Sequence, residues 1–385
     1  MIPYGRQDIS QADIDAVVAV LQSDYLTQGP MVPRFEQAVA IRCGAKRAVA
    51  VNSATSALHL ACRALDLGQG DCLWTVPNTF VASANCGLYC GAEVDFVDID
   101  PLSWNMSIAA LQEKLVLAKR KSRLPKVVVP VHFGGQPTEQ EAIWELSREF
   151  GFKVIEDASH AIGASRNGEP VGNCRWSDIT VFSFHPVKII TTGEGGMALT
   201  NSEELAKRMA LLRSHGITRE VAHMRRSADG PWYYEQLDLG YNYRLTDLQA
   251  ALGVSQLARL DEFVERRNDI ARRYDNLLAG FPLLTPTVDS QNKSAFHLYV
   301  VRLQITAIRR THREVFESLR EQGVGVNLHY MPVHLNPYYR DLGFGPGLCP
   351  EAERHGQEAI SIPLYPGLTD TQQDKVVSAL KMALA

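Results

Sequence analysis

The sequence predicts an α/β protein with a large domain built around a central, mostly parallel sheet and a smaller C-terminal α+β domain. Three observations carry this prediction. From about residue 45, short β-rich runs alternate with helix-length stretches, which is typical of βαβ units. The 385 residues exceed the size at which one hydrophobic core keeps growing, so two domains are expected. The pattern then changes after a long helical stretch, where Pro282 and Pro286 interrupt the chain.

In the large domain, the expected strands and helices alternate along the chain. Strands are expected at residues 48–52, 72–76, 93–99, 126–133, 153–157, 178–184 and 195–200, and helices at 56–65, 80–89 and 138–150. In the first of these helices Leu58, Ala61 and Leu65 recur on one face, the spacing of an amphipathic helix. A long helix at residues 245–281, broken near Gly253, is expected to follow.

The smaller domain is expected to combine strands with helices. Strands are expected at residues 296–303 and 325–330, and helices at 312–323 and 370–385. A further helix at residues 10–22 is expected to pack beside this domain. The predicted large domain therefore covers residues 20–270, and the predicted small domain covers 271–385 together with 1–19.

Composition and charge argue against several classes of protein. A net charge of −4 provides no basic surface, so nucleic acid is not expected as a partner. No apolar run approaches the ~18 residues of a membrane span, and no signal core begins the chain, so we expect a cytoplasmic protein without a membrane partner. Cys86 and Cys90 lie four residues apart, but no second ligand pair at metal spacing accompanies them. We therefore expect structural thiols and no metal site.

Two stretches at the ends of expected strands carry groups that could bind a phosphate and a cation. The segment Ser53–Ser56 opens a helix, where free N–H groups, the helix dipole and hydroxyls bind phosphate. A serine N-cap that binds nothing explains the same pattern. Glu156 and Asp157 end a buried strand at the sheet edge where open α/β sheets bind ligands. Such an acid needs a cationic partner, for example a protonated ring nitrogen, although capping of the next helix is an alternative.

The stretch FSFHPVKIITTGEGG contains one lysine among apolar and aromatic neighbours. Lysine is rarely buried unless its charge is used or paired. Ser183 and Lys188 lie five residues apart across a strand end that Pro186 stops. A desolvated lysine has a lowered pKa and becomes a nucleophilic amine that forms Schiff bases. Phe80, just past another strand end, could cover a flat ligand, although aromatics at such positions are more often core residues.

Together these groups match the requirements of one cofactor. A phosphate cup, an acid for a pyridinium nitrogen, an aromatic ring and an amine for an aldehyde are what pyridoxal 5′-phosphate (PLP) needs. We therefore predict that Lys188 holds PLP as a Schiff base. A nicotinamide dehydrogenase is disfavoured, because the turn in VNSATSA contains no glycine for a pyrophosphate.

Six stretches, in this order, resemble the DegT/DnrJ/EryC1/StrS family of sugar-nucleotide aminotransferases. They are NSATSALHLA, VPNTFVASAN, VDIDP, VIEDASHAIGA, FSFHPVKIITTGEGG and GYNYRLTDLQAALG. The resemblance extends over nearly the whole chain. It implies a PLP-dependent aminotransferase of fold type I that forms a homodimer with two shared active sites.

The resemblance also implies which residues contact the cofactor. Lys188 is implied to form the Schiff base, and Asp157 to pair with the pyridinium nitrogen. Phe80 is implied to stack on the ring, and His160 to lie beside it, where many relatives have glutamine. The implied phosphate ligands are Ala54, Thr55, Ser56 and Ser183, joined by Asn242 of the partner subunit.

Within the family, four stretches, among them SDYLTQGPMVPRFEQA and LHYMPVHLNPYY, are most similar to the transaminases of pseudaminic acid biosynthesis. This similarity implies a UDP-linked 4-keto-6-deoxy N-acetylhexosamine as amino acceptor and L-glutamate as donor. The residues implied to line the sugar-nucleotide site are Tyr4, Asp24, Tyr25, Leu26, Thr27, His329, Tyr330, Met331 and Pro332. Tyrosines on surface loops are the alternative explanation for part of this set.

Three alternatives remain open at this point. A 4-aminotransferase could act on a different nucleotide-linked 4-keto sugar. A cofactor-dependent sugar dehydrase would use the same scaffold, but such relatives commonly replace the lysine by histidine, and position 188 is lysine although His185 lies nearby. A binding protein without catalysis would not need the lysine, the acid and the phosphate cup together.

Overall fold

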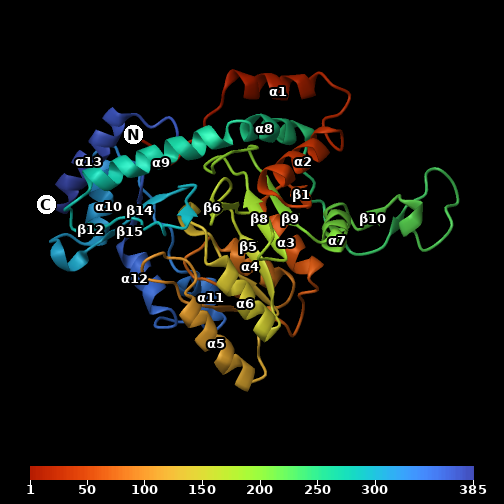
Figure 1. Cartoon of the computed structure of the whole chain (residues 1–385), viewed down its shortest axis with the longest axis horizontal. Helices are drawn as coiled ribbons and strands as arrows, with labels where there is room; N and C mark the ends of the chain where they lie inside the picture. The colour runs from red at the N-terminus through yellow and green to blue at the C-terminus, as the bar shows by residue number, and fades with distance from the viewer.

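The computed structural model describes all of residues 1–385, and a seven-stranded sheet lies at its centre (Figure 1). Its strands are β1 (Arg47–Val51), β2 (Cys72–Thr75), β3 (Glu93–Phe96), β4 (Val127–Val129), β5 (Lys153–Asp157), β8 (Ile179–Ser183) and β9 (Gly196–Thr200). They are arranged in the order β1-β9-β8-β5-β4-β2-β3. Only β9 runs antiparallel to its neighbours, and every other pair is parallel. The predicted mostly parallel sheet is confirmed.

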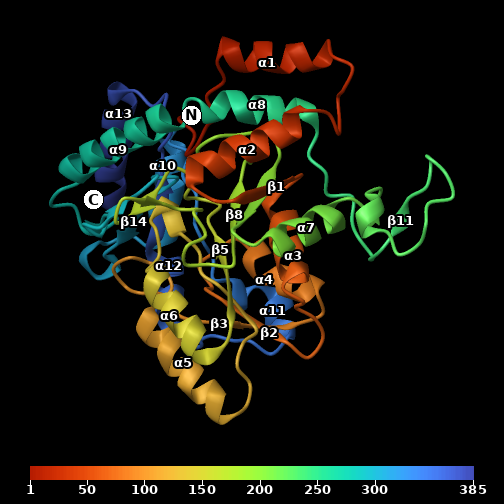
Figure 2. The same cartoon turned by 45° about the vertical axis from the view of Figure 1, so that its right-hand side comes forward.

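Helices pack around this sheet (Figures 1 and 2). They are α1 (Gln11–Leu21), α2 (Met31–Cys43), α3 (Ala54–Ala64), α4 (Ala82–Tyr89), α5 (Ile108–Arg120), α6 (Gln140–Phe150), α7 (Glu203–Arg213) and α8 (Asp247–Leu257). Successive residues of a strand point to opposite faces. Val181 of β8 accordingly lies in a core with Leu58 of α3, whereas Phe182 lies in a second core with Phe35 of α2.

A smaller unit contains an antiparallel sheet of three strands in the order β12-β14-β15. Its elements are α9 (Leu260–Leu277), β12 (Leu283–Leu284), β14 (Tyr299–Leu303), α10 (His312–Glu321), α12 (Pro350–Glu358), β15 (Ala359–Ile362) and α13 (Asp370–Leu384). The short helix α11 (Pro337–Asp341) packs on the large sheet instead, where the Tyr339 hydroxyl donates to Asn85 Oδ1 (2.6 Å). Ile2 joins the core of this unit, and its N–H donates to the carbonyl of Gly323 (2.8 Å). Helix α1, which we expected beside this unit, packs on α8 instead.

Short elements complete the chain. They are β6 (Ser165–Arg166), β7 (Glu169–Pro170), β10 (Ile217–Thr218), β11 (Glu235–Gln236), β13 (Asn292–Lys293) and the 3-10 turns η1 (Phe133–Gly135), η2 (Val221–His223), η3 (Ile305–Ala307) and η4 (Val333–Leu335). The arm that carries β10 and β11 projects from the body (Figures 1 and 2). All seven cysteines are unpaired, and only Cys72 and Cys90 are not buried. No helix has the length and the apolar character that crossing a bilayer requires.

Two expected features differ from the structure. The break expected near Gly253 is wrong: Gly253 lies inside α8, and the helix is interrupted at Ala258 and Arg259, between α8 and α9. A Cβ atom at Gly253 would lie 2.6 Å from Cζ of Phe35, so glycine is there for close packing of α8 on α2. Residues 325–330 form no strand, because only isolated bridges, such as that of Asn327 with Ser361, hold them.

Candidate active site

A cavity of about 560 Å³ lies at the carboxyl ends of β5 and β8, the edge where open α/β sheets bind ligands. Ten of the predicted site residues line it: Tyr4, Ala54, Thr55, Phe80, Asp157, His160, Ser183, Lys188, His329 and Tyr330. They range from the N-terminal segment to residues 329–330 and come from several elements between. The folded chain therefore brings together groups that are up to 326 positions apart in the sequence.

The Lys188 amine faces this cavity from the loop between β8 and β9. Its Nζ lies 3.4 Å from Nε2 of His297. Burial lowers the pKa of Lys188 to about 8, against the opposite effect of the Asp157 carboxylate. Near neutral pH the amine is thus deprotonated far more often than that of an ordinary lysine, which suits a nucleophile or a base.

Of the two acids at the end of β5, only Asp157 lines the cavity, because neighbouring strand residues face opposite sides. Asp157 is 5% exposed, and its carboxylate accepts from Ser83 Oγ (2.6 Å) and from the Ser159 N–H (3.1 Å). Glu156 instead accepts from Thr180 Oγ1 (2.6 Å) beneath the sheet edge, beside His132. The acid available to a cationic ring nitrogen is therefore Asp157.

The N-terminus of α3 forms one wall of the cavity. Ser53 is its N-cap, and its Oγ accepts from the Ser56 N–H (3.1 Å), so this serine caps the helix whether or not the helix start binds an anion. The Ser56 hydroxyl donates to Asn52 Oδ1 (2.7 Å) and does not line the cavity. The N–H groups of Ala54 and Thr55 belong to the first turn, where no helical acceptor exists, so they are available to an anion.

Three neutral imidazoles lie around the Lys188 amine. The rings of His160 and His297 have centroids 4.4 Å apart, and His160 Nε2 lies 3.2 Å from the Tyr330 hydroxyl. Burial, reinforced by the positive charge of Lys188, holds the pKa values of His160 and His297 well below 6.5 and lowers that of His329 to about 3. Neutral imidazoles offer both a donor and an acceptor without competing for the charge of Asp157.

The remaining predicted residues lie outside the cavity of the single chain. They are Ser56, the exposed segment Asp24–Thr27, Asn242, Met331 and Pro332. Asn242 is exposed and forms a bridge with Ser214, next to the base of the projecting arm. Phe80 lines the cavity but is 60% exposed, as expected for a side chain at its mouth.

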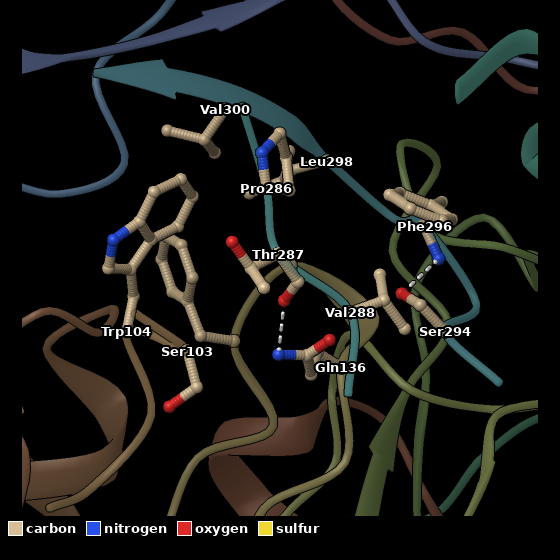
Figure 3. A pocket seen from close by; sticks show the side chains of 12 residues that line it. Ser103, Trp104, Gln136, Pro286, Thr287, Val288, Ser294, Phe296, Leu298 and Val300 are labelled. Carbon is tan, nitrogen blue, oxygen red and sulfur yellow. Dashed lines mark hydrogen bonds between the residues drawn. The ribbon is translucent and has the colours of Figure 1, made fainter. Parts of the chain in front are cut away.

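Four residues of the site were not predicted from the sequence: Ser83, Glu194, His297 and Asn327. Glu194, His297 and Asn327 line the cavity, and the Ser83 hydroxyl donates to Asp157. The only signal for His297 was a polar residue in the apolar run FHLYVVRL. A second cavity, of about 20 Å³ beside Trp104 (Figure 3), has no titratable side chain in its lining and offers no such chemistry.

The fold and the cavity together define a class of enzyme. A lysine amine of lowered pKa, a fixed carboxylate and a helix N-terminus converge at the sheet edge, and this set fits PLP. The first turn of α3 is held against β9 so closely that a Cβ atom on Gly196 would collide with the Ala54 nitrogen. The model of the DegT/DnrJ/EryC1/StrS aminotransferase family matches residues 7–381, and the chain belongs to this family.

Similar proteins support the same class. The chain is 38% identical to a UDP-4-amino-4,6-dideoxy-N-acetyl-beta-L-altrosamine transaminase of Campylobacter jejuni, over 95% of this chain and 93% of the relative. The structure of Helicobacter pylori PseC, an aminotransferase of pseudoaminic acid biosynthesis, superposes with a TM-score of 0.91 at 30% identity, covering 100% and 99% of the two chains. A Streptococcus pneumoniae protein assigned as a sugar aminotransferase, in its PMP form, superposes with a TM-score of 0.90 at 28% identity, covering 100% and 99%. The chain is a PLP-dependent sugar aminotransferase.

Proposed function

We propose that this enzyme transfers the amino group of L-glutamate to C4 of a UDP-linked 4-keto-6-deoxy N-acetylhexosamine. The products would be UDP-4-amino-4,6-dideoxy-N-acetyl-β-L-altrosamine and 2-oxoglutarate. The observation that carries this substrate is the 38% identity, over 95% of the chain, to the Campylobacter jejuni transaminase. The fold shared with the Helicobacter pylori enzyme supports it.

The proposed roles follow from the contacts of each side chain. Lys188 holds the cofactor through its amine and, once displaced by the donor, moves the proton between the substrate carbon and the cofactor. Bound PLP supplies an electron sink for the negative charge left by that proton. Asp157, fixed by Ser83, keeps the ring nitrogen protonated. The N–H groups of Ala54 and Thr55 bind the phosphate.

The ring faces and the sugar site complete the assignment. Phe80 covers one face of the cofactor ring at the mouth of the cavity, and His160 lies beside the ring. Ser183 adds a hydroxyl to the phosphate. Tyr4, His329 and Tyr330, which line the same cavity, contact the sugar nucleotide.

We also propose that two copies of the chain share their active sites. Asn242 is exposed and outside its own cavity, which supports a role as phosphate ligand in the cavity of a second copy. The exposed segment Asp24–Thr27, with Met331 and Pro332, is proposed to contact the sugar nucleotide from outside the single-chain cavity. A homodimer of this kind is the commonest symmetric assembly of soluble proteins.

A visible absorbance titration tests the proposed reaction. The purified enzyme with PLP should show the visible band of the lysine-bound cofactor, and L-glutamate should bleach it. After removal of the donor, the UDP-linked 4-keto-6-deoxy N-acetyl sugar should restore the band. Bleaching without restoration would keep the aminotransferase but reject this sugar in favour of another nucleotide sugar. Lys188→Ala should never show the band, and Lys207→Ala, on the exposed face of α7, is the matched control.

A further inference from the structure

His297 is the one side chain within hydrogen-bond reach of the Lys188 amine, with 3.4 Å between Nε2 and Nζ. The imidazole is 4% exposed, and its Nδ1 has no hydrogen-bond partner. A neutral imidazole has one N–H and one acceptor nitrogen. An unpaired polar atom in the interior is costly, so the hydrogen bonds of the ring do not by themselves explain its position. The backbone on either side of His297 explains it.

The backbone around His297 is fixed by its surroundings. Phe296, immediately before it, has a left-handed φ of +43°, and its N–H donates to Ser294 Oγ (3.0 Å; Figure 3). On the other side lies Gly135, where a Cβ atom would stand 2.7 Å from the Phe296 nitrogen and 2.9 Å from that of His297. A left-handed bulky residue persists only where neighbouring structure enforces it, and such residues cluster at functional sites.

A buried arginine completes this support. Arg267 of α9 is 1% exposed and pairs with no acid, and its Nη1 donates to the carbonyl oxygens of Phe296 (3.1 Å), His297 (3.3 Å) and Leu364 (3.1 Å). A buried guanidinium without a carboxylate is costly, so a structural need must offset it. Its positive charge also opposes protonation of the His297 imidazole, whose pKa is held low mainly by burial.

We propose that His297 is a positioning residue, whose Nε2 holds the Lys188 amine whenever that amine is not bonded to the cofactor. This inference rests on the proposed role of Lys188 in proton transfer. A protonated amine left free in the cavity would be attracted to the Asp157 carboxylate, which would remove both groups from their tasks. A neutral acceptor at 3.4 Å keeps the amine in place and favours its protonated form only by one hydrogen bond, so the amine can still release its proton.

Two substitutions separate this role from simple packing. His297→Leu removes the acceptor, and His297→Gln keeps an amide near the position of Nε2. In the apoprotein, the pH dependence of Lys188 acylation by acetic anhydride, followed by peptide mass spectrometry, should have its midpoint near 8 for the wild type. Loss of a hydrogen bond to the charged amine should lower the midpoint by about one pH unit in the leucine variant. The glutamine variant should stay near the wild type.

This titration isolates one group. The titratable side chains that line the cavity together with the amine are Tyr4, Asp157, His160, His185, Glu194, His297, His329 and Tyr330. Burial holds the pKa values of His160, His297 and His329 below 6.5 and raises that of Tyr330 above 10, so none of these four neighbours titrates between pH 7 and 9.5, where Lys188 does.

A second readout uses the loaded enzyme and L-glutamate alone, so that the identity of the sugar does not affect it. The single-turnover bleaching rate should fall at least about tenfold in His297→Leu, with a larger deuterium isotope effect from 2-deuterated glutamate, and His297→Gln should recover most of the rate. A wild type without a visible band would reject the proposed function, whereas the acylation measurement would still decide the contact.

Unchanged midpoints and rates in both variants would overturn the proposal. If neither variant folds, the ¹⁵N resonance of His297 Nε2 in the wild-type apoprotein decides. Replacing Lys188 in Lys188→Met should shift that resonance, because the hydrogen bond to it is lost. A resonance that does not move overturns the proposal.

Discussion

At the scale of single residues, the burial of the Lys188 amine links catalysis to stability. Its pKa of about 8 in the folded protein lies below the ordinary 10.5. Below pH 8 the amine is protonated in both the folded and unfolded states. Between about pH 8 and 10.5 the unfolded chain binds a proton that the folded protein does not, so this residue's contribution to stability rises with pH across that window.

We therefore predict that Lys188→Met stabilises the apoprotein at pH 7, and that this advantage shrinks as the pH rises from about 8 to 10.5. Methionine carries no charge, so the variant does not bear the free-energy cost of burying one. The wild type bears this cost until the buried amine loses its proton. Denaturant unfolding of both apoproteins at several pH values measures it. Lys207→Met, on the exposed face of α7, should follow the wild type at every pH. A stability difference that is constant with pH would contradict the assignment.

A second residue-scale prediction concerns the support of Asp157. Ser83→Ala removes the hydroxyl that donates to Asp157 Oδ2 at 2.6 Å. A hydrogen bond to a charged group of this kind is worth about 1.5–3 kcal/mol, so kcat should fall roughly tenfold or more, and PLP should dissociate more readily. Steady-state kinetics and a PLP titration measure both effects. Ser147→Ala, which removes a hydroxyl bonded within α6, is the control and should leave kcat unchanged.

At the scale of elements, the packing of α8 on α2 explains why a glycine is tolerated in a helix. Gly253→Ala should stabilise α8 by roughly 1 kcal/mol from helix propensity alone. The new Cβ would, however, lie 2.6 Å from the Phe35 ring, and overpacking of this kind costs about 1–3 kcal/mol. We predict a net loss of stability, measured as a lower midpoint of denaturant unfolding. Gly68→Ala, where no atom lies within 4 Å of the new Cβ, should have little effect, and equal results for both variants would reject this explanation.

The elements also show what the sequence could and could not predict. Strands of the sheet interior are rich in apolar residues, so β5 and β8 were predicted within one residue of their observed ends. The strand predicted at 126–133 was too long, because only Val127–Val129 form β4 and the chain turns into η1 at Phe133. The predicted strand at 325–330 failed because its residues alternate like a strand but find only isolated bridge partners. Helices α2, α5 and α7 were not predicted, because their stretches carry none of the sequence motifs that located the site.

Some residues of the site could also be predicted from the sequence, and others could not. Lys188 and Asp157 stand out because charged residues follow buried strands, so their pattern was informative. The contact between His297 and Lys188 spans 109 positions and depends on the left-handed backbone at Phe296, which no periodicity encodes. The residue pattern alone left Glu156 and Asp157 as equal candidates, and the family resemblance implied Asp157. The structure shows the physical reason, because the two acids occupy opposite faces of the sheet.

At the scale of the whole molecule, the proposed shared active sites predict complementation between two inactive variants. Lys188→Ala lacks its own lysine, and Asn242→Asp would place a negative charge against the phosphate of the partner's cofactor. In a mixture unfolded and refolded together, half of the dimers are hybrids with one intact site, so activity should recover to about a quarter of the wild type. Each variant refolded alone is the control. No recovery, with dimers present by size-exclusion chromatography, would place Asn242 outside the partner's site.

The contact of the N-terminal residues with residues 324–330 has a consequence for how the enzyme is made. Ile2 bridges to Val324, and Tyr4 and Tyr330 line the same cavity as Lys188. That cavity is incomplete until the ribosome has released residue 330, so a growing chain folds its central sheet without a finished place for the cofactor. Loading with PLP thus becomes one of the last events in biosynthesis, and truncated translation products should leave the ribosome colourless.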